Sequence, residues 1–124
     1  VDVVPLSIGI ETEGGAMATI IERNALIPVK KSHTFSTFET RGVVIRVFEG
    51  ERNMTKDNRL LGNFELMMPP TPNWPTLIEL AFDVEEDSIL KVSAVQKGSD
   101  WTQDVTITHD KGRLSEGEIE RMVR

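Results

Sequence analysis

The 124-residue chain contains no cysteine, which excludes a disulfide-stapled scaffold, a catalytic thiol and a cysteine-ligated zinc site. It has no run of about 18 apolar residues, so the sequence predicts no membrane-spanning helix, and no signal-peptide pattern opens it. Basic residues are in the minority, since 14 Lys and Arg stand against 20 Asp and Glu, giving a formal net charge of −6. This balance argues against nucleic acid or a membrane surface as the main partner.

The motifs of common catalytic sites are also missing from the sequence. No GxxxxGK[ST] or GxGxxG segment is present to cradle a nucleotide phosphate, and no Gly-x-Ser-x-Gly nucleophile elbow occurs. The two histidines, His33 and His109, have no metal-ligating partner three or four residues away. The sequence therefore offers no catalytic residue and no metal ligand, and we expect these residues by themselves not to form an enzyme.

What is present is the composition of an ordinary globular domain. Apolar residues make up 39% of the chain and charged residues 27%, which is close to the usual values. A chain of this length can bury roughly two thirds of its unfolded surface. We therefore expect one core and one main domain, residues 1–114, followed by the start of a helix in residues 115–124.

Apolar alternation predicts that most of the chain is β-strand. In residues 76–85 every second side chain from Ile78 to Val84 is apolar, and Glu79, Asp83 and Glu85 point the other way. Residues 89–96 repeat the pattern after a polar break and predict a hairpin. Residues 43–49 are apolar on both faces, which predicts that one face closes the core and the other meets a second surface. Weaker strands are expected at 16–22, 32–38, 61–66 and 104–108.

Many short strands separated by turn residues predict a mainly β fold, either a sandwich or a barrel. A parallel α/β fold is not expected, because no helical segments alternate with the strands. At the end of the chain, Ser115 and Glu118 form a capping box, flanked by Leu114 and Ile119 as a hydrophobic staple. We expect this helix to continue past Arg124; the alternative is a short terminal helix that packs on the body.

In the absence of catalytic residues, the most informative positive feature is a possible binding surface. If one face of residues 43–48 lines a concave surface, it offers an apolar pocket to an extended chain. Leu6, Ile8 and Ile10 alternate in the same way near the start of the sequence. The alternative is that all these side chains are ordinary core residues.

Specific segments resemble the substrate-binding domain of the heat-shock protein 70 chaperones, in order and over essentially the whole chain. They are residues 2–12 (DVVPLSIGIET), 23–24 and 27–28 (RN and IP), 50–58 (GERNMTKDN), 60–66 (LLGNFEL), 82–84 and 89–94 (FDV and ILKVSA), 110–115 (DKGRLS) and 118–123 (EIERMV). The resemblance implies a β-sandwich of two four-stranded antiparallel sheets, whose loops form a channel for an extended peptide.

The resemblance also implies a larger parent protein, in which an ATPase domain precedes this segment and a helical lid follows it. ATP and magnesium would belong to that ATPase domain, so no cofactor is expected in this segment. The implied partners are unfolded or extended hydrophobic peptides and, for the parent, the ATPase domain and co-chaperones. The segments at 54–58 and 110–115 are most similar to eukaryotic cytosolic members, which implies a cytoplasmic location, with the nucleus as a further compartment.

Carried over residue by residue, the resemblance implies an apolar pocket centred on Val43 and two loops that bracket the peptide. The pocket positions are Ile8, Ile10, Phe35, Val43, Ile45 and Ile78. The bracketing positions are Thr12 and Glu13 in one loop and Ser36, Thr37 and Phe38 in the other, with residues 13 and 38 as the two halves of an arch over the peptide.

Two departures from the family pattern bear on this site. The arch position that is small or apolar in familiar members is Glu13 here, and the segment between Phe38 and Val43 is two residues shorter than usual. We hypothesise that Glu13 makes the rim acidic and favours peptides with Lys or Arg beside their apolar core. The alternative function is a β-sandwich interaction scaffold without a peptide channel.

Overall fold

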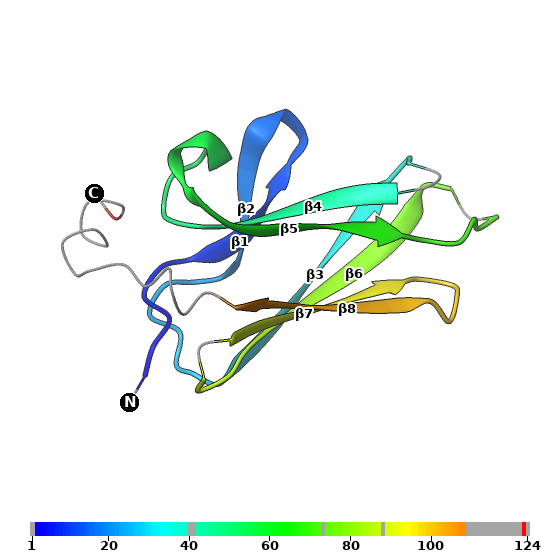
Figure 1. Cartoon of the computed structure of the whole chain (residues 1–124). Coiled ribbons are helices and arrows are strands. Elements are labelled where there is room, and N and C mark those ends of the chain that lie inside the picture. The colour runs from blue at the N-terminus through cyan, green and yellow to red at the C-terminus, as the bar shows by residue number, and fades with distance from the viewer. Residues whose placement is uncertain (1, 40–41, 73, 88, 109–122, 124) are drawn as a thin grey trace.

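Eight strands form two antiparallel sheets in the computed structural model, which describes residues 2–39, 42–72, 74–87, 89–108 and 123 (Figure 1). The β4 sheet contains, in spatial order, β2 (Ala16–Ile21), β1 (Ile8–Thr12), β4 (Gly42–Glu49) and β5 (Arg59–Met67). The β6 sheet contains β3 (Val29–Thr37), β6 (Thr76–Val84), β7 (Ile89–Gln96) and β8 (Thr102–Thr108). Two short 3-10 turns, η1 (Glu13–Gly15) and η2 (Thr55–Asp57), lie between strands. The mainly β sandwich of two four-stranded antiparallel sheets is confirmed.

The core lies between the sheets and is built by the alternation of β6. Ile78, Leu80 and Phe82 have no exposed surface, whereas Glu79, between two of them, faces outward and forms an ion pair with Lys97 (N–O distance 3.6 Å). Because side chains alternate across a strand, the same spacing on β7 brings its apolar residues to this core. The hairpin predicted from residues 76–96 is therefore present, with β6 and β7 paired from Ile78 to Val84.

Two expected strand features are corrected by the structure. β3 begins at Val29 rather than at residue 32. Lys30 and Lys31 are exposed on this edge strand, so the first residues of β3 lack the apolar alternation that predicts a strand. The second apolar face of residues 43–49 was expected to meet another surface. Within the described residues, no such surface covers it at Val44, whose side chain is 52% exposed.

Topology gathers several strand ends at one end of the sandwich, which we call the β3–β4 end. Thr37 at the end of β3 pairs with Thr76 at the start of β6. Gly42 at the start of β4 pairs with Met67 at the end of β5. β1 pairs with the far end of β4, from Ile8 opposite Glu49 to Ile10 opposite Val47, and its later residues lead toward the middle of β4. Chain segments distant in sequence can therefore form one site here.

The Gln103 side chain fastens the two sheets at their β5 and β8 edges. Its amide Nε2 donates to the Glu65 carbonyl (3.0 Å), and its Oε1 accepts from the Met67 N–H (3.4 Å). Both bonds satisfy backbone groups of an edge strand, which otherwise invite pairing with another chain. The amide thus holds β5, and the segment that follows it, against the β6 sheet.

The helix expected from Ser115 and Glu118 lies outside the described residues, apart from Val123, which is helical. The predicted division at residue 114 lies there too. Within the described ranges, no helix is long and apolar enough to cross a membrane.

Candidate functional site

The six apolar residues predicted for the pocket belong to one cluster with the sandwich core. Four of them are at most 5% exposed and fill the core; they are Ile8, Ile10, Ile45 and Ile78. Only Phe35 and Val43 are half-buried and pack against this cluster from its margin. In this conformation a ligand can touch Phe35 and Val43 directly, while the other four support them from behind.

The first loop, Thr12–Gly15, joins β1 to β2, contains η1 and lies beside residues 52–58, which join the far end of β4 to β5 (Figure 1). Gly14 (φ 81°) and Gly15 (φ 79°) both adopt left-handed backbone conformations, which glycine takes at little cost. The Thr12 hydroxyl donates to the Ala16 carbonyl (3.1 Å) and closes the turn. Glu13, the predicted arch residue, is exposed. Its carboxylate is therefore placed where it adds charge to the surface without a burial cost.

A bracing loop, residues 52–58, supports the first loop from the side (Figure 1). Thr55 is 3% exposed, and its Oγ1 lies 2.9 Å from Glu11 Oε1 and 3.1 Å from the Gly15 carbonyl oxygen. The Met17 N–H donates to the Asn53 carbonyl (2.8 Å). The two Thr55 contacts join residues that are 44 and 40 positions apart in the sequence. They fix the first loop, so its position does not depend on a ligand.

Thr55→Val is expected to weaken this bracing without a change in volume. Removing the hydroxyl leaves the Gly15 carbonyl and Glu11 with one donor fewer, which costs about 1 to 2 kcal/mol in the free energy of unfolding. Urea denaturation and backbone amide exchange of residues 12–17 measure the effect. Faster exchange confined to the first loop is the expected result; unchanged exchange there would contradict the bracing role.

The second loop, residues 36–39, follows β3 and is braced in a different way. Phe38 is 62% exposed, and its ring makes a T-shaped contact with Trp74 (centroids 4.9 Å apart, planes at 76°). The Trp74 indole Nε1–H donates to the Phe38 carbonyl (3.4 Å). The Glu39 N–H donates to the Thr37 hydroxyl (3.1 Å). Of the predicted bracketing residues here, Ser36 is exposed and Thr37 half-buried.

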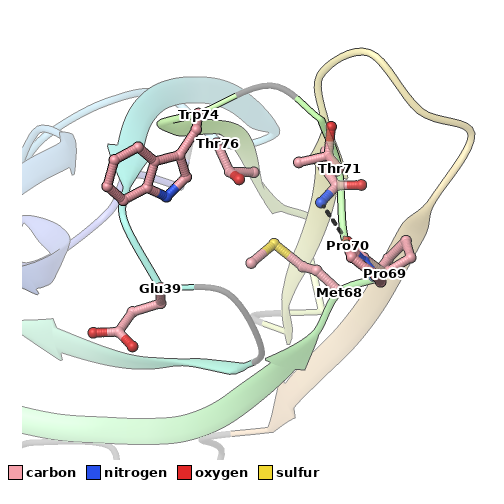
Figure 2. Close-up of a pocket in the computed structure, with 8 residues that line it drawn as sticks. Glu39, Met68, Pro69, Pro70, Thr71, Trp74 and Thr76 are labelled. Atoms are coloured by element: carbon pink, nitrogen blue, oxygen red, sulfur yellow. Dashed lines mark hydrogen bonds between the residues drawn. The ribbon is translucent and has the colours of Figure 1, made fainter.

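A small pocket of about 70 Å³ opens between this loop and the proline-rich loop, residues 68–72 and 74–75 (Figure 2). Its lining residues are Glu39, Met68, Pro69, Pro70, Thr71, Trp74, Thr76 and Gln96. The Gln96 side chain is buried, donates from Nε2 to the Pro69 carbonyl (3.0 Å) and accepts at Oε1 from the Ser99 hydroxyl (2.7 Å). The pocket wall is thus anchored to β7.

Sequence reasoning missed this pocket and its principal residue, Trp74. The available signal was a tryptophan within residues 67–75, whose four prolines cannot donate to a strand ladder and so predict only a stiff surface connection. Met68 departs from this prediction, since it is buried at 8% exposure. The partner of Trp74 lies 36 residues earlier in the chain, at Phe38, and no local pattern connects the two.

Among the described residues, no group of three or more His, Asp or Glu side chains is placed to hold a metal ion.

The model of the family described as "Hsp70 protein" matches residues 1–124, the whole chain. The chain belongs to the Hsp70 family. A heat shock 70 kDa protein of Trichophyton rubrum is 58% identical over 125 aligned residues, covering 98% of this chain and 19% of the relative. Heat shock 70 kDa protein 2 of Paracoccidioides lutzii matches equally, with the same coverage. Heat shock cognate 70 kDa protein 3 of Dictyostelium discoideum is 53% identical over 126 residues, covering 99% of this chain and 20% of the relative.

The Hsp70 chain therefore spans about a fifth of the length of the relatives it matches. The family is one of heat-shock chaperones that act in the stress response.

Proposed function

We propose that this Hsp70 segment is a peptide-binding module, which holds extended, hydrophobic stretches of unfolded polypeptides at the β3–β4 end. The observation that carries the proposal is the placement of Val43 and Phe35. These two apolar residues stay accessible at the margin of the core, and the loops that follow β1 and β3 are each braced by a neighbouring segment. A preformed apolar site between fixed polar loops is suited to a ligand that is extended and partly apolar.

The physical basis of binding has two parts. Hydrogen bonds between loop backbone and peptide backbone give affinity that tolerates many sequences, as in strand addition. One apolar side chain buried against Val43 then adds selection, worth about 1.5 to 3 kcal/mol for a Leu or Ile. Folded proteins hide both features, so unfolded segments are chosen.

For the whole protein we propose the further parts and partners that the family resemblance implies. An ATPase domain would precede this segment and use ATP with magnesium, a helical lid would follow, and co-chaperones would bind the parent. The proposed location is the cytoplasm, with the nucleus as a further compartment.

A labelled heptapeptide with a central leucine tests the proposal by fluorescence anisotropy. Saturable binding in the micromolar range is expected, and the same peptide with a central aspartate should bind at least tenfold more weakly, because an apolar pocket does not repay the desolvation of a carboxylate. A parallel titration with labelled ATP tests the alternative that the segment takes part in nucleotide binding. Absence of saturable peptide binding would favour the scaffold function.

A further inference from the structure

We propose that the pocket beside Trp74 is a second subsite, which accepts an arginine side chain from one flank of a bound peptide. The inference rests on the proposed peptide-binding function and adds a specificity determinant to it. Its basis is the set of groups that the second loop and the proline-rich loop bring together (Figure 2).

The walls of the pocket are suited to an aliphatic stem that ends in a flat cation. Met68, Pro69 and Pro70 supply apolar surface, and Trp74 lies across the pocket from the two prolines (Figure 2). Trp74 is 65% exposed, yet its indole is held by the hydrogen bond and the T-shaped contact with Phe38. The contact is T-shaped, so the two rings do not stack face to face. A guanidinium stacks on an indole face, whereas an ammonium is more strongly hydrated and stacks less well.

The charge of the pocket selects a cation. Glu39 is the only charged side chain among the lining residues, and it lies on the same side as Trp74 (Figure 2). Neither of the two ion pairs found in the described part of the chain, Arg59–Glu49 and Lys97–Glu79, involves Glu39. The buried Gln96 amide is already bonded at both ends within the protein. A peptide arginine could thus pair with Glu39 while its stem contacts the prolines.

The location of the pocket predicts that only one flank of the peptide is read. Glu39 stands four positions before Val43, on the chain segment that passes from β3 to β4. Trp74 immediately precedes Pro75 and β6. The first loop, with Glu13, belongs to β1 and β2 and offers no aromatic residue among residues 12–15. An arginine on the flank that faces the proline-rich loop should therefore bind better than one on the other flank.

The test uses heptapeptides with a central leucine and one arginine, lysine or citrulline on either flank, measured by anisotropy at low salt. Citrulline keeps the shape of arginine and removes its charge. Arginine on one flank is expected to raise affinity about threefold to tenfold over citrulline, and lysine to raise it less. Trp74→Ala and Glu39→Gln should each abolish the gain, which is measured in each variant as the ratio of its arginine to its citrulline affinity because Trp74 also braces Phe38.

Two matched variants separate this subsite from general effects. Glu13→Gln removes the other acidic rim residue, and Leu26→Ala removes an apolar side chain of similar exposure (64%) beside the opposite end of β3. Both should retain the one-flank arginine gain. In a Trp101→Phe background, Trp74 is the remaining tryptophan, and its emission should change with the arginine peptide and not with citrulline.

Equal affinities for arginine and citrulline on both flanks would overturn the subsite while the central-leucine peptide still bound. A gain lost in Glu13→Gln but kept in Trp74→Ala and Glu39→Gln would also overturn it, because it would place the charge effect at the first loop. If no peptide of the series bound saturably, the proposed peptide-binding function would itself have failed.

Discussion

Val43→Phe is expected to lower affinity for the central-leucine peptide at least tenfold, with the fold intact. Val43 is half-buried at the margin of the core and pairs across the sheet with Leu66, which is fully buried. A phenylalanine at this position cannot move into the filled core, so its added carbons extend into the space proposed for the peptide side chain. A tenfold loss corresponds to about 1.4 kcal/mol, close to the value of one apolar side chain.

Val44→Phe is the matched control, because it makes the same change one residue away on the opposite face of β4. Val44 is 52% exposed and does not join the core. Its substitution should alter peptide affinity less than twofold. Circular dichroism of both variants confirms that they fold, and anisotropy gives the affinities. Equal losses in the two variants would show that Val43 is not part of the binding site.

Gly9→Ala is expected to lower the free energy of unfolding by about 3 kcal/mol, the upper end of the range for overpacking. A Cβ at Gly9 would lie 2.8 Å from the Ala18 carbonyl carbon and 2.9 Å from Thr19 Cα. Both are backbone atoms of the paired strand β2, so no flexible side chain can yield. β1 and β2 must separate for the methyl group to fit, and the first loop, which joins them, would shift as well.

Gly62→Ala in β5 is the control for this prediction. A Cβ there would meet only side-chain carbons of Ile107, at 3.5 to 3.6 Å, which is ordinary van der Waals contact. Its free energy of unfolding should change by less than about 1 kcal/mol. Urea denaturation of the two variants measures the difference. Similar midpoints for both would contradict the close β1–β2 approach.

Strand alternation predicts much of this fold, and its failures have physical causes. The alternation of apolar and polar residues in β6 and β7 is unambiguous because one face is buried and the other faces solvent, as Phe82 and Glu79 illustrate. Alternation does not reveal the start of β3, because this edge strand carries Lys30 and Lys31, charged residues that a central strand would not tolerate. The order of the strands within each sheet depends on long-range pairing, which alternation does not encode; the family resemblance implies two four-stranded sheets, and the structure gives the order within them.

The candidate site is less predictable from the residues alone. Core residues and pocket residues share the same inward-facing positions, so alternation cannot separate buried Ile78 from accessible Phe35, although the two are paired across β6 and β3. The subsite around Trp74 depends on a contact between segments 36 residues apart. Such contacts are set by tertiary packing, and the structure is required to find them.

The most direct test of peptide binding at the β3–β4 end is methyl NMR of the chain with a central-leucine heptapeptide. Intermolecular nuclear Overhauser effects are expected from the leucine methyl groups to Val43 and to the Phe35 ring, and none to Val44. Saturable binding with contacts elsewhere, or with Val43 unaffected, would contradict it.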